Sequence, residues 1–263
     1  MGIVKPAGQI LLQEMRQAVD QLRGCVLPIY DANEQQEAEL LGSGVLVELS
    51  GSTFLCTAKH VIDRSEASNL YVSGPEKLEQ LLGVFRSTKE HDTAVLKLSP
   101  EQIALLQKFH PLRAEHIATG SEALACKYVE FIGYPETKNR KIYNKTMLEN
   151  LVHSNGCKVI EINESRVRVA FDRKKNIDAH TRQRVQAPDP HGMSGGAMFG
   201  VPVDVKTLVG SPEPKLIGIT TDKPDSKEVF GTNISVALAI VRDSWSTPLP
   251  ERLNPAHITT HEL

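Results

Sequence analysis

The sequence lacks several features that would assign it to a specialised class. Aromatic residues make up only 5% of the 263 residues and include a single tryptophan, Trp245, which argues against a stacking platform for single-stranded nucleic acid. The net charge is −2, so no basic excess attracts nucleic acid or an anionic membrane. No apolar run approaches the roughly 18 residues that a membrane span needs. We therefore expect neither nucleic acid nor a membrane as a partner.

The cysteines also lack the spacing that metal sites need. None of the four lies in a C-x-x-C pair or near a histidine at zinc-ligand spacing, so we expect no metal and no cofactor. Cys56 and Cys126 are interpreted as small apolar residues within strands. The N-terminal residues show no basic stretch followed by an apolar run and a cleavage site. We expect a cytoplasmic protein with reduced thiols.

What the sequence does contain is a long series of short strands. A helix is predicted over 7–23, where apolar residues recur at helical spacing before Gly24. Short apolar or alternating runs follow, among them one at 80–87, until a helical segment at 101–109 interrupts them. A second series of strands ends in a helix predicted over 235–244. Two series of about six strands with a connector indicate an all-β double unit.

This pattern predicts two units of similar size with an extension at each end. The connector places the division between the units just after residue 112. We predict an N-terminal helical extension at 1–23, a first β unit at 24–112, a second β unit with the C-terminal helix at 113–245, and a polar tail at 246–263.

Three segments carry residues suited to acyl transfer. His60 follows an apolar strand in FLCTAKHVID, Asp92 precedes an alternating strand in HDTAVLKL, and Ser194 lies in the glycine-rich HGMSGGAMFG. Acyl transfer needs a nucleophile, a base within reach of it, and a group that fixes the tautomer of the base. Ser194, His60 and Asp92 can fill these three roles. Taken singly, His60 could be a core histidine and Asp92 a turn residue, and Asp63 also lies near His60 in the sequence.

The glycines around Ser194 have a reason of their own. An oxyanion hole built from backbone N–H groups needs a chain that bends tightly and approaches the substrate carbonyl closely. We predict that Gly192 and Ser194 donate the two N–H groups, while Gly195 and Gly196 leave room beside the nucleophile.

Together, these motifs resemble those of trypsin-like serine peptidases of the chymotrypsin fold. The order histidine, aspartate, serine is that of this family. GSGVLVELSGSTFLCTAKHVI resembles its first-barrel hairpin, DTAVLKL its aspartate strand, GMSGG its nucleophile turn and LIGITT its pocket strand. FIGYP resembles a corner found in bacterial relatives of the Deg/Htr kind. The resemblance covers roughly 24–245 and indicates a bacterial cytosolic type, distantly similar to Deg/Htr protease domains without a PDZ domain.

The resemblance implies both a fold and an activity. The fold would be two six-stranded antiparallel β-barrels with an N-terminal and a C-terminal helix. His60 and Asp92 would come from the first barrel, Ser194 from the second, and the site would lie between them. The implied activity is that of a serine endopeptidase acting on a protein or peptide substrate, without metal or cofactor.

The resemblance also implies a substrate-binding region. The Thr221 hydroxyl would support the triad aspartate, and the backbone from Thr220 to Lys223 would pair with an extended substrate. Asp189 and His191 would lie in the segment that forms the wall and base of the primary specificity pocket. Asp189 could favour lysine or arginine at that position of the substrate, although it stands one residue away from the acidic position of basic-specific relatives. Asp222 is a second candidate acid.

One departure from the family pattern concerns activation. Met193 stands where secreted relatives have the aspartate that pairs with a new N-terminus after cleavage, and methionine cannot form that ion pair. Activation by N-terminal clipping is therefore not expected. Activity would be constitutive, or set by ordering of the loop 172–193 through a regulatory protein partner. The alternative function is a catalytically silent binding or regulatory module with a protease fold.

Overall fold

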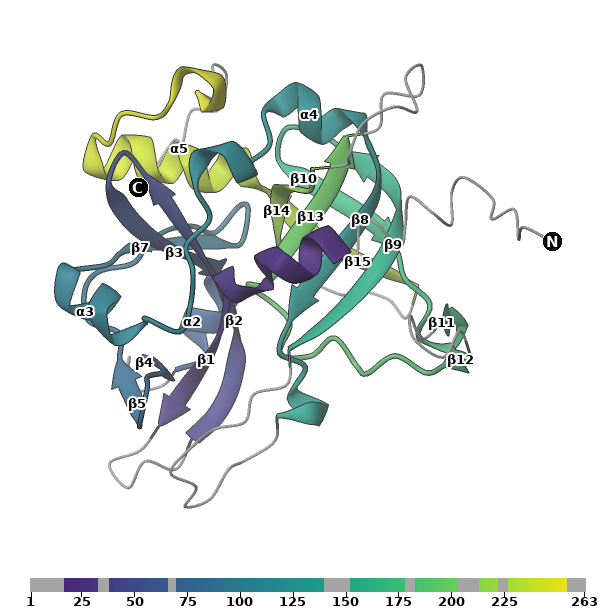
Figure 1. The fold of residues 1–263 in the computed structure, drawn as a ribbon, viewed down its shortest axis with the longest axis horizontal. Helices are drawn as coiled ribbons and strands as arrows, with labels where there is room; N and C mark the ends of the chain where they lie inside the picture. The colour runs from purple at the N-terminus through teal and green to yellow at the C-terminus, as the bar shows by residue number, and fades with distance from the viewer. Residues whose placement is uncertain are drawn as a thin grey trace.

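The computed structural model describes residues 17–32, 38–65, 70–139, 152–177, 183–202, 213–221 and 227–254. Two β units built from successive parts of the chain lie side by side, and the helix α5 (Ile234–Trp245) lies above the first of them (Figure 1). The chain is therefore mostly β, as the strand series predicts.

The first unit is an open antiparallel sheet of seven strands. Their order across the sheet is β5-β4-β1-β2-β3-β7-β6. The strands are β1 (Val26–Ala32), β2 (Ala38–Leu49), β3 (Ser52–Ala58), β4 (Leu70–Ser73), β5 (Leu78–Gln80), β6 (Arg86–Thr88) and β7 (Thr93–Lys97).

The expected six-stranded closed barrel is thus wrong for this unit. The single strand predicted at 80–87 is broken, and its two parts become the opposite edges of the sheet, β5 against β4 and β6 against β7. Gly83 lies between them with φ of +125°, a conformation outside the strand region. A continuous strand at this place would have joined the two edges. The break therefore leaves the sheet open.

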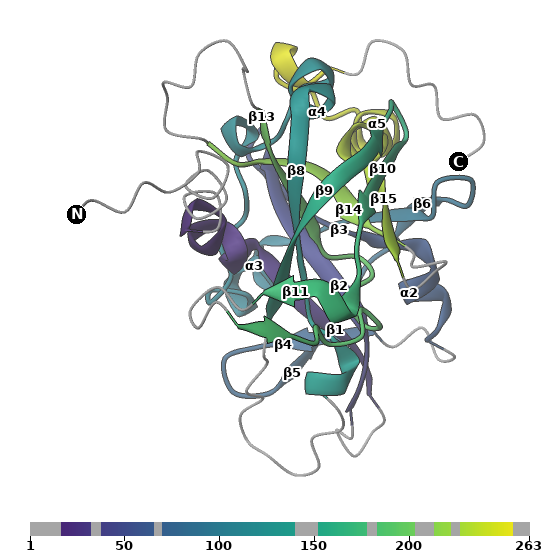
Figure 2. The ribbon, with the colours of Figure 1, turned by 90° about the vertical axis from the view of Figure 1, so that its right-hand side faces the viewer.

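The second unit is a closed barrel of six strands in the order β10-β15-β14-β13-β8-β9. All its strand pairs are antiparallel. In the turned view, its strands run between α4 and α5 at the upper end and β11 at the lower end (Figure 2). The strands are β8 (Cys126–Gly133), β9 (His153–Ile162), β10 (Arg166–Ala170), β13 (Ala197–Pro202), β14 (Lys215–Thr220) and β15 (Glu228–Asn233), with a separate ribbon of β11 (Asn176–Ile177) and β12 (Arg184–Val185).

Short helices connect the strands. Residues 17–22 are helical, and the remainder of the helix predicted over 7–23 lies outside the described residues apart from Arg23. Two of the helices begin with capping boxes at Ser99 and Thr119, which satisfy their first amides. The helices are η1 (Arg23–Cys25), α2 (Lys59–Asp63), α3 (Pro100–Leu105), η2 (Ala114–His116), α4 (Gly120–Ala125), η3 (Glu136–Lys138), η4 (Arg173–Lys175), α5 and η5 (Glu251–Leu253).

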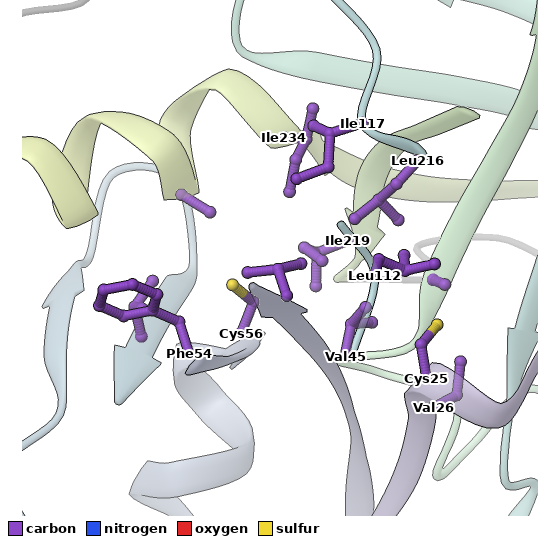
Figure 3. Close-up of a cluster of buried hydrophobic side chains, with 14 of the residues drawn as sticks. Cys25, Val26, Val45, Phe54, Cys56, Leu112, Ile117, Leu216, Ile219 and Ile234 are labelled. Carbon is purple, nitrogen blue, oxygen red and sulfur yellow. The ribbon is translucent and has the colours of Figure 1, made fainter. Parts of the chain in front are cut away.

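One hydrophobic core joins the two units. Cys56 and Phe54 of the first sheet belong to the same buried cluster as Ile219 of the barrel and Ile234 of α5 (Figure 3). The Trp245 ring lies 5.5 Å from that of Phe54. Since burial of each such side chain stabilises by about 1.5–3 kcal/mol, the interface between the units contributes substantially to the fold.

The part of the tail that is described folds back onto the units. The Arg252 guanidinium donates to the carbonyl oxygens of Ala114 at 2.7 Å and Ile117 at 3.1 Å, and it pairs with Glu122. Leu253 is buried. The tail is therefore anchored as far as residue 254. No helix within the described ranges has the length and apolar character to cross a membrane.

Candidate functional site

The pairing of two strands brings His60 next to Asp92. β3 and β7 are neighbours, with Ala58 opposite Thr93, so the residues just after β3 and just before β7 meet at one end of the sheet. The Lys59 amide donates to the Asp92 carbonyl at 3.0 Å and closes this end. The order of the motifs in the sequence thus becomes proximity in the sheet.

The Asp92 carboxylate holds His60 through two hydrogen bonds. The His60 backbone N–H donates to Oδ1 at 2.9 Å, and the ring Nδ1 lies 2.6 Å from Oδ2. Because the carboxylate can only accept, Nδ1 carries the proton and Nε2 is left to act as a base. Asp92 itself has φ of +47°, a left-handed conformation that aspartate tolerates better than most residues.

The competing carboxylate near His60 is engaged elsewhere. Both oxygens of Asp63 accept from the Lys59 Nζ at 2.6 Å, one turn along α2. Of the two acids considered from the sequence, the structure therefore places Asp92 on His60.

Ser194 lies in a turn that only glycine permits at two positions. Gly192 and Gly195 have φ of +87° and +85°. A Cβ on Gly192 would stand 2.6 Å from the Tyr134 carbonyl oxygen, and one on Gly195 would stand 1.9 Å from the Ser43 carbonyl oxygen. Both the backbone conformation and the lack of space exclude other residues here.

The same contacts bring Ser194 to the His60 end of the first sheet. The Ser43 amide on β2 donates to the Ser194 carbonyl oxygen at 2.7 Å. A Cβ on Gly42 would stand within 3 Å of both the Ser194 carbonyl oxygen and the side chain of Val61, the residue after His60. The structure therefore brings His60, Asp92 and Ser194 into one region where the two units meet.

In two peptide units beside Ser194, the carbonyl oxygen accepts a hydrogen bond while the N–H group makes none to a described residue. The His191 carbonyl accepts from the Glu136 amide at 2.7 Å, and the Met193 carbonyl from the Gly196 amide at 2.9 Å. A trans peptide points its N–H opposite to its C=O, so these bonds also orient the amides of Gly192 and Ser194. Those two amides donate no hydrogen bond to any residue in the described part of the chain.

Met193, which precedes Ser194, packs inside the barrel. Its side chain is buried in the core of the barrel, in one cluster with Ala187, Phe131 and Met198. Burial of a methionine stabilises by about 1.5–3 kcal/mol, and it requires no new N-terminus. The turn is ordered by this packing.

Thr220 and Thr221, the described part of the predicted substrate segment, form backbone hydrogen bonds within the protein. The Thr220 amide donates to the Gly196 carbonyl at 2.8 Å, and its carbonyl accepts from the Gly195 amide at 2.6 Å. The Thr221 amide donates to Phe230 at 3.0 Å. The expectation that Thr220 pairs with substrate is therefore wrong, because both its backbone groups support the turn. Asp222 and Lys223 lie outside the described residues.

The Thr221 hydroxyl does not support Asp92 as expected. No hydrogen bond joins the two among the residues that can be described, although Thr221 is buried. The barrel instead reaches this segment through Thr232 on β15, whose hydroxyl donates to the His91 carbonyl. Thr232 could not be inferred from the sequence, because it lies outside every motif.

Asp189 forms an ion pair inside the protein. Its Oδ2 lies 2.6 Å from the Arg173 guanidinium, which also donates to the Ala187 carbonyl at 3.2 Å. The His191 amide donates to the other oxygen at 3.3 Å, while the His191 ring is exposed. The candidate acid of the specificity pocket therefore already has a cation beside it.

Two further chemical features bear on the site. All four cysteines are buried, and none of them forms a disulfide bond. Across the ranges that the structure describes, no three histidine, cysteine or acidic residues gather closely enough to hold a metal ion.

Comparisons with known proteins add little to this geometry. No family model matches the chain, and no curated protein matches it. Among the solved structures that match is a chain from a study of the coupled folding and binding of the intrinsically disordered Sesbania mosaic virus VPg protein. It is 11% identical, covers 80% of this chain and 92% of its own length, and has a TM-score of 0.45. A likeness at this level carries no argument about function.

Proposed function

We propose that this chain is a serine endopeptidase of the trypsin-like, chymotrypsin-fold type that cleaves protein or peptide substrates through an acyl-enzyme. Ser194 is the nucleophile. His60 takes its proton and delivers it to the leaving amine, while Asp92 stabilises the imidazolium. The amides of Gly192 and Ser194 bind the oxyanion, so the reaction uses no metal or cofactor.

The observation that carries the proposal is the double hydrogen bond between Asp92 and His60 beside the Ser194 turn. Backbone N–H and ring Nδ1 are both held, at 2.9 Å and 2.6 Å, so the ring has one orientation and one tautomer. A histidine that served only packing would have no need of an accessible Nε2. The His60 side chain, however, is 41% exposed. The amides of Gly192 and Ser194, which donate to no described residue, supply the remaining component that acyl transfer requires.

The proposal extends to fold, activation and location. We interpret the open first sheet as a variant of the first barrel of this family, with its fifth strand broken at Gly83. Met193 supports activity without N-terminal cleavage, because the turn is ordered by packing and backbone hydrogen bonds. We propose a cytoplasmic enzyme, because none of its four cysteines forms a disulfide bond. A regulatory partner would act on access to the site.

The Arg173–Asp189 ion pair limits what can be proposed about specificity. A carboxylate that already binds a guanidinium at 2.6 Å offers less attraction to a basic substrate side chain than an unpaired one. The proposal therefore includes no preference for lysine or arginine before the scissile bond.

A fluorophosphonate probe tests the proposed function directly. The purified wild-type chain should react at one site, mapped to Ser194 by peptide mass spectrometry, and Ser194→Ala should not react. Ser235→Ala is a suitable control, because the Ser235 hydroxyl donates to the Glu164 carbonyl at 2.8 Å and lies outside the site. Absence of wild-type labelling, or labelling that persists in Ser194→Ala, would contradict the proposal.

The second candidate function is a silent module that binds proteins through the same fold. The oriented His60 argues against it, and so do the two amides that have no acceptor within the described ranges, because a binding module has no need of either. Labelled wild-type protein that cleaves no unstructured protein substrate would favour this alternative. Unlabelled protein that still captures a partner through the Ser194 face would favour it more strongly.

A further inference from the structure

A second serine, Ser43, lies at the centre of the contacts between the two units. It belongs to β2 of the first sheet and is fully buried. Its amide donates to the Ser194 carbonyl at 2.7 Å, and its hydroxyl donates to the Gly192 carbonyl at 2.9 Å. The hydroxyl also accepts from the Tyr134 amide at 2.9 Å. One residue of the first unit thus holds both residues that would supply the oxyanion hole.

The Ser43 hydroxyl completes the restraint on Gly192. Glycine can adopt several backbone conformations, so the direction of its N–H depends on the two peptide units that flank it. The peptide before Gly192 is fixed by the bond from Glu136 to the His191 carbonyl. The peptide after it is fixed by the Ser43 hydroxyl on one side and by the bond from Met193 to Pro190 on the other. Without the hydroxyl, the Gly192 carbonyl has no partner among the described residues.

The carbonyl of Ser43 is held as well. It accepts from the Thr57 hydroxyl at 2.7 Å, and Thr57 lies on β3 only three residues before His60. The same backbone therefore connects the strand that leads to His60 with the turn that carries Ser194. This arrangement fixes the base and the oxyanion amides relative to each other.

We propose that Ser43 is a positioning residue for the oxyanion hole. This inference rests on the proposed function. It adds that the first unit orders the oxyanion hole, a task that Met193 cannot perform through an ion pair. Ser43 touches neither substrate nor nucleophile hydroxyl. Its effect is to keep the Gly192 amide directed at the site before any substrate binds.

The test is the rate at which Ser194 reacts with a fluorophosphonate, because that reaction also develops negative charge on an oxygen. Ser43→Ala should lower the second-order rate of labelling by about 10- to 100-fold, less than the loss of a direct donor. The pH dependence of labelling should keep its shape, because the His60–Asp92 hydrogen bonds do not involve Ser43. A purely structural role would lower the melting temperature and leave the rate of the folded protein unchanged.

Ser99→Ala is the matched control. It makes the same chemical change at a hydroxyl that accepts from the Gln102 amide at 3.3 Å, far from the site at the start of α3. It should lower the melting temperature and leave the labelling rate unchanged. Equal loss of rate in Ser43→Ala and Ser99→Ala would overturn the proposal, as would a wild-type rate in folded Ser43→Ala or a shifted pH profile.

A second variant keeps the test decisive if Ser43→Ala does not fold. Ser43→Cys retains nearly the same size with a weaker donor, so an intermediate rate is expected. A wild-type rate in Ser43→Cys would show that the hydroxyl is not needed. Failure of the proposed function is distinguished by the wild-type protein, which would then not label at Ser194 at all.

Discussion

The first sheet and the second barrel hold their candidate catalytic groups by different means. In the first sheet, side chains are fixed by other side chains, as when the Asp92 carboxylate binds His60. In the barrel, the Ser194 turn is fixed almost wholly through backbone groups and two glycines with positive φ. Moreover, the donor that holds the turn most directly, Ser43, comes from the other unit. The Ser194 turn is therefore ordered by both units, through packing and backbone bonds within the barrel and through Ser43 from the first sheet.

This difference predicts how each half responds to substitution. A side-chain arrangement can be broken chemically without disturbing the fold, because an isosteric residue fills the same space. A backbone arrangement cannot, because any added atom meets a main-chain group. Substitutions in the first sheet should thus separate activity from stability, whereas substitutions in the turn should lower both.

The largest effect is expected from Asp92→Asn. The amide can no longer enforce the tautomer with a proton on Nδ1, so the rate of substrate cleavage or probe labelling should fall by about 10⁴-fold, equivalent to about 5.5 kcal/mol. Thermal unfolding should change little, since the two side chains have almost the same shape.

Asp63→Asn is the matched control for this substitution. Asp63 is much nearer to His60 in the sequence than Asp92 is, but its carboxylate binds Lys59 on an exposed face. An exposed pair of this kind contributes about 0–1 kcal/mol to stability, and its loss should leave the labelling rate within about twofold of wild type. A larger loss of rate in Asp63→Asn than in Asp92→Asn would show that the acid has been assigned wrongly.

Gly195→Ala should have the next largest effect, this time on both properties. The new Cβ would overlap the Ser43 carbonyl oxygen, and the alanine would have to adopt a positive φ. The overlap and the backbone strain together should lower the free energy of unfolding by about 3–5 kcal/mol. Displacement of the Ser194 turn should also remove labelling. Urea unfolding and the labelling rate measure the two consequences.

Gly51→Ala separates the two causes of this loss. Gly51 has φ of +74°, but nothing lies within 4 Å of the position of its Cβ. Its substitution should cost about 1–2 kcal/mol from backbone strain alone and leave labelling intact. If both variants lost the same stability, the close contact between the turn and the first sheet would not be the source of the effect.

The sequence predicted the meeting of His60 and Asp92 better than it predicted the sheet that carries them. His60 and Asp92 could be paired because each directly adjoins a strand, and neighbouring strands fix which ends meet. The open first sheet could not be predicted, because the break at Gly83 depends on a local turn within an apparently continuous run.

The substrate-binding residues were harder to predict for a related reason. A shift of one residue along β14 changes which of Thr220 and Thr221 faces the turn, and an apolar pattern does not fix that register. The partner of Asp189 is Arg173, 16 residues away across a loop, where no periodicity applies. Ser43 was visible in GSG, but nothing in that motif shows that its hydroxyl reaches the Gly192 carbonyl 149 residues away.

The smallest effect tests whether the two units unfold together. Burial raises the pKa of the Cys56 thiol in the first sheet to about 12. Burial also raises the pKa of Cys126 in the barrel to about 12, aided by Glu122 and partly opposed by Lys127. Both folded values lie above the unfolded value of about 9, so the unfolded state binds fewer protons at high pH. Stability from these thiols is complete below pH 9 and is lost as the pH rises toward 12.

Comparison of pH 8 with pH 10 isolates the contribution of each thiol. At pH 10, each of the two thiols should lower the free energy of unfolding by about 1.4 kcal/mol relative to neutral pH. Cys56→Ala should remove the part of this pH dependence that is due to Cys56, and Cys126→Ala the part that is due to Cys126. The core that joins the units predicts a single urea transition in which both shares appear, because Cys56 packs in a cluster containing Ile219 of the barrel. Two transitions, with the Cys56 share in one and the Cys126 share in the other, would mean that the units unfold separately. Ser43 would then hold the Ser194 turn across an interface that can open, and labelling should fail at the urea concentration where the first transition occurs.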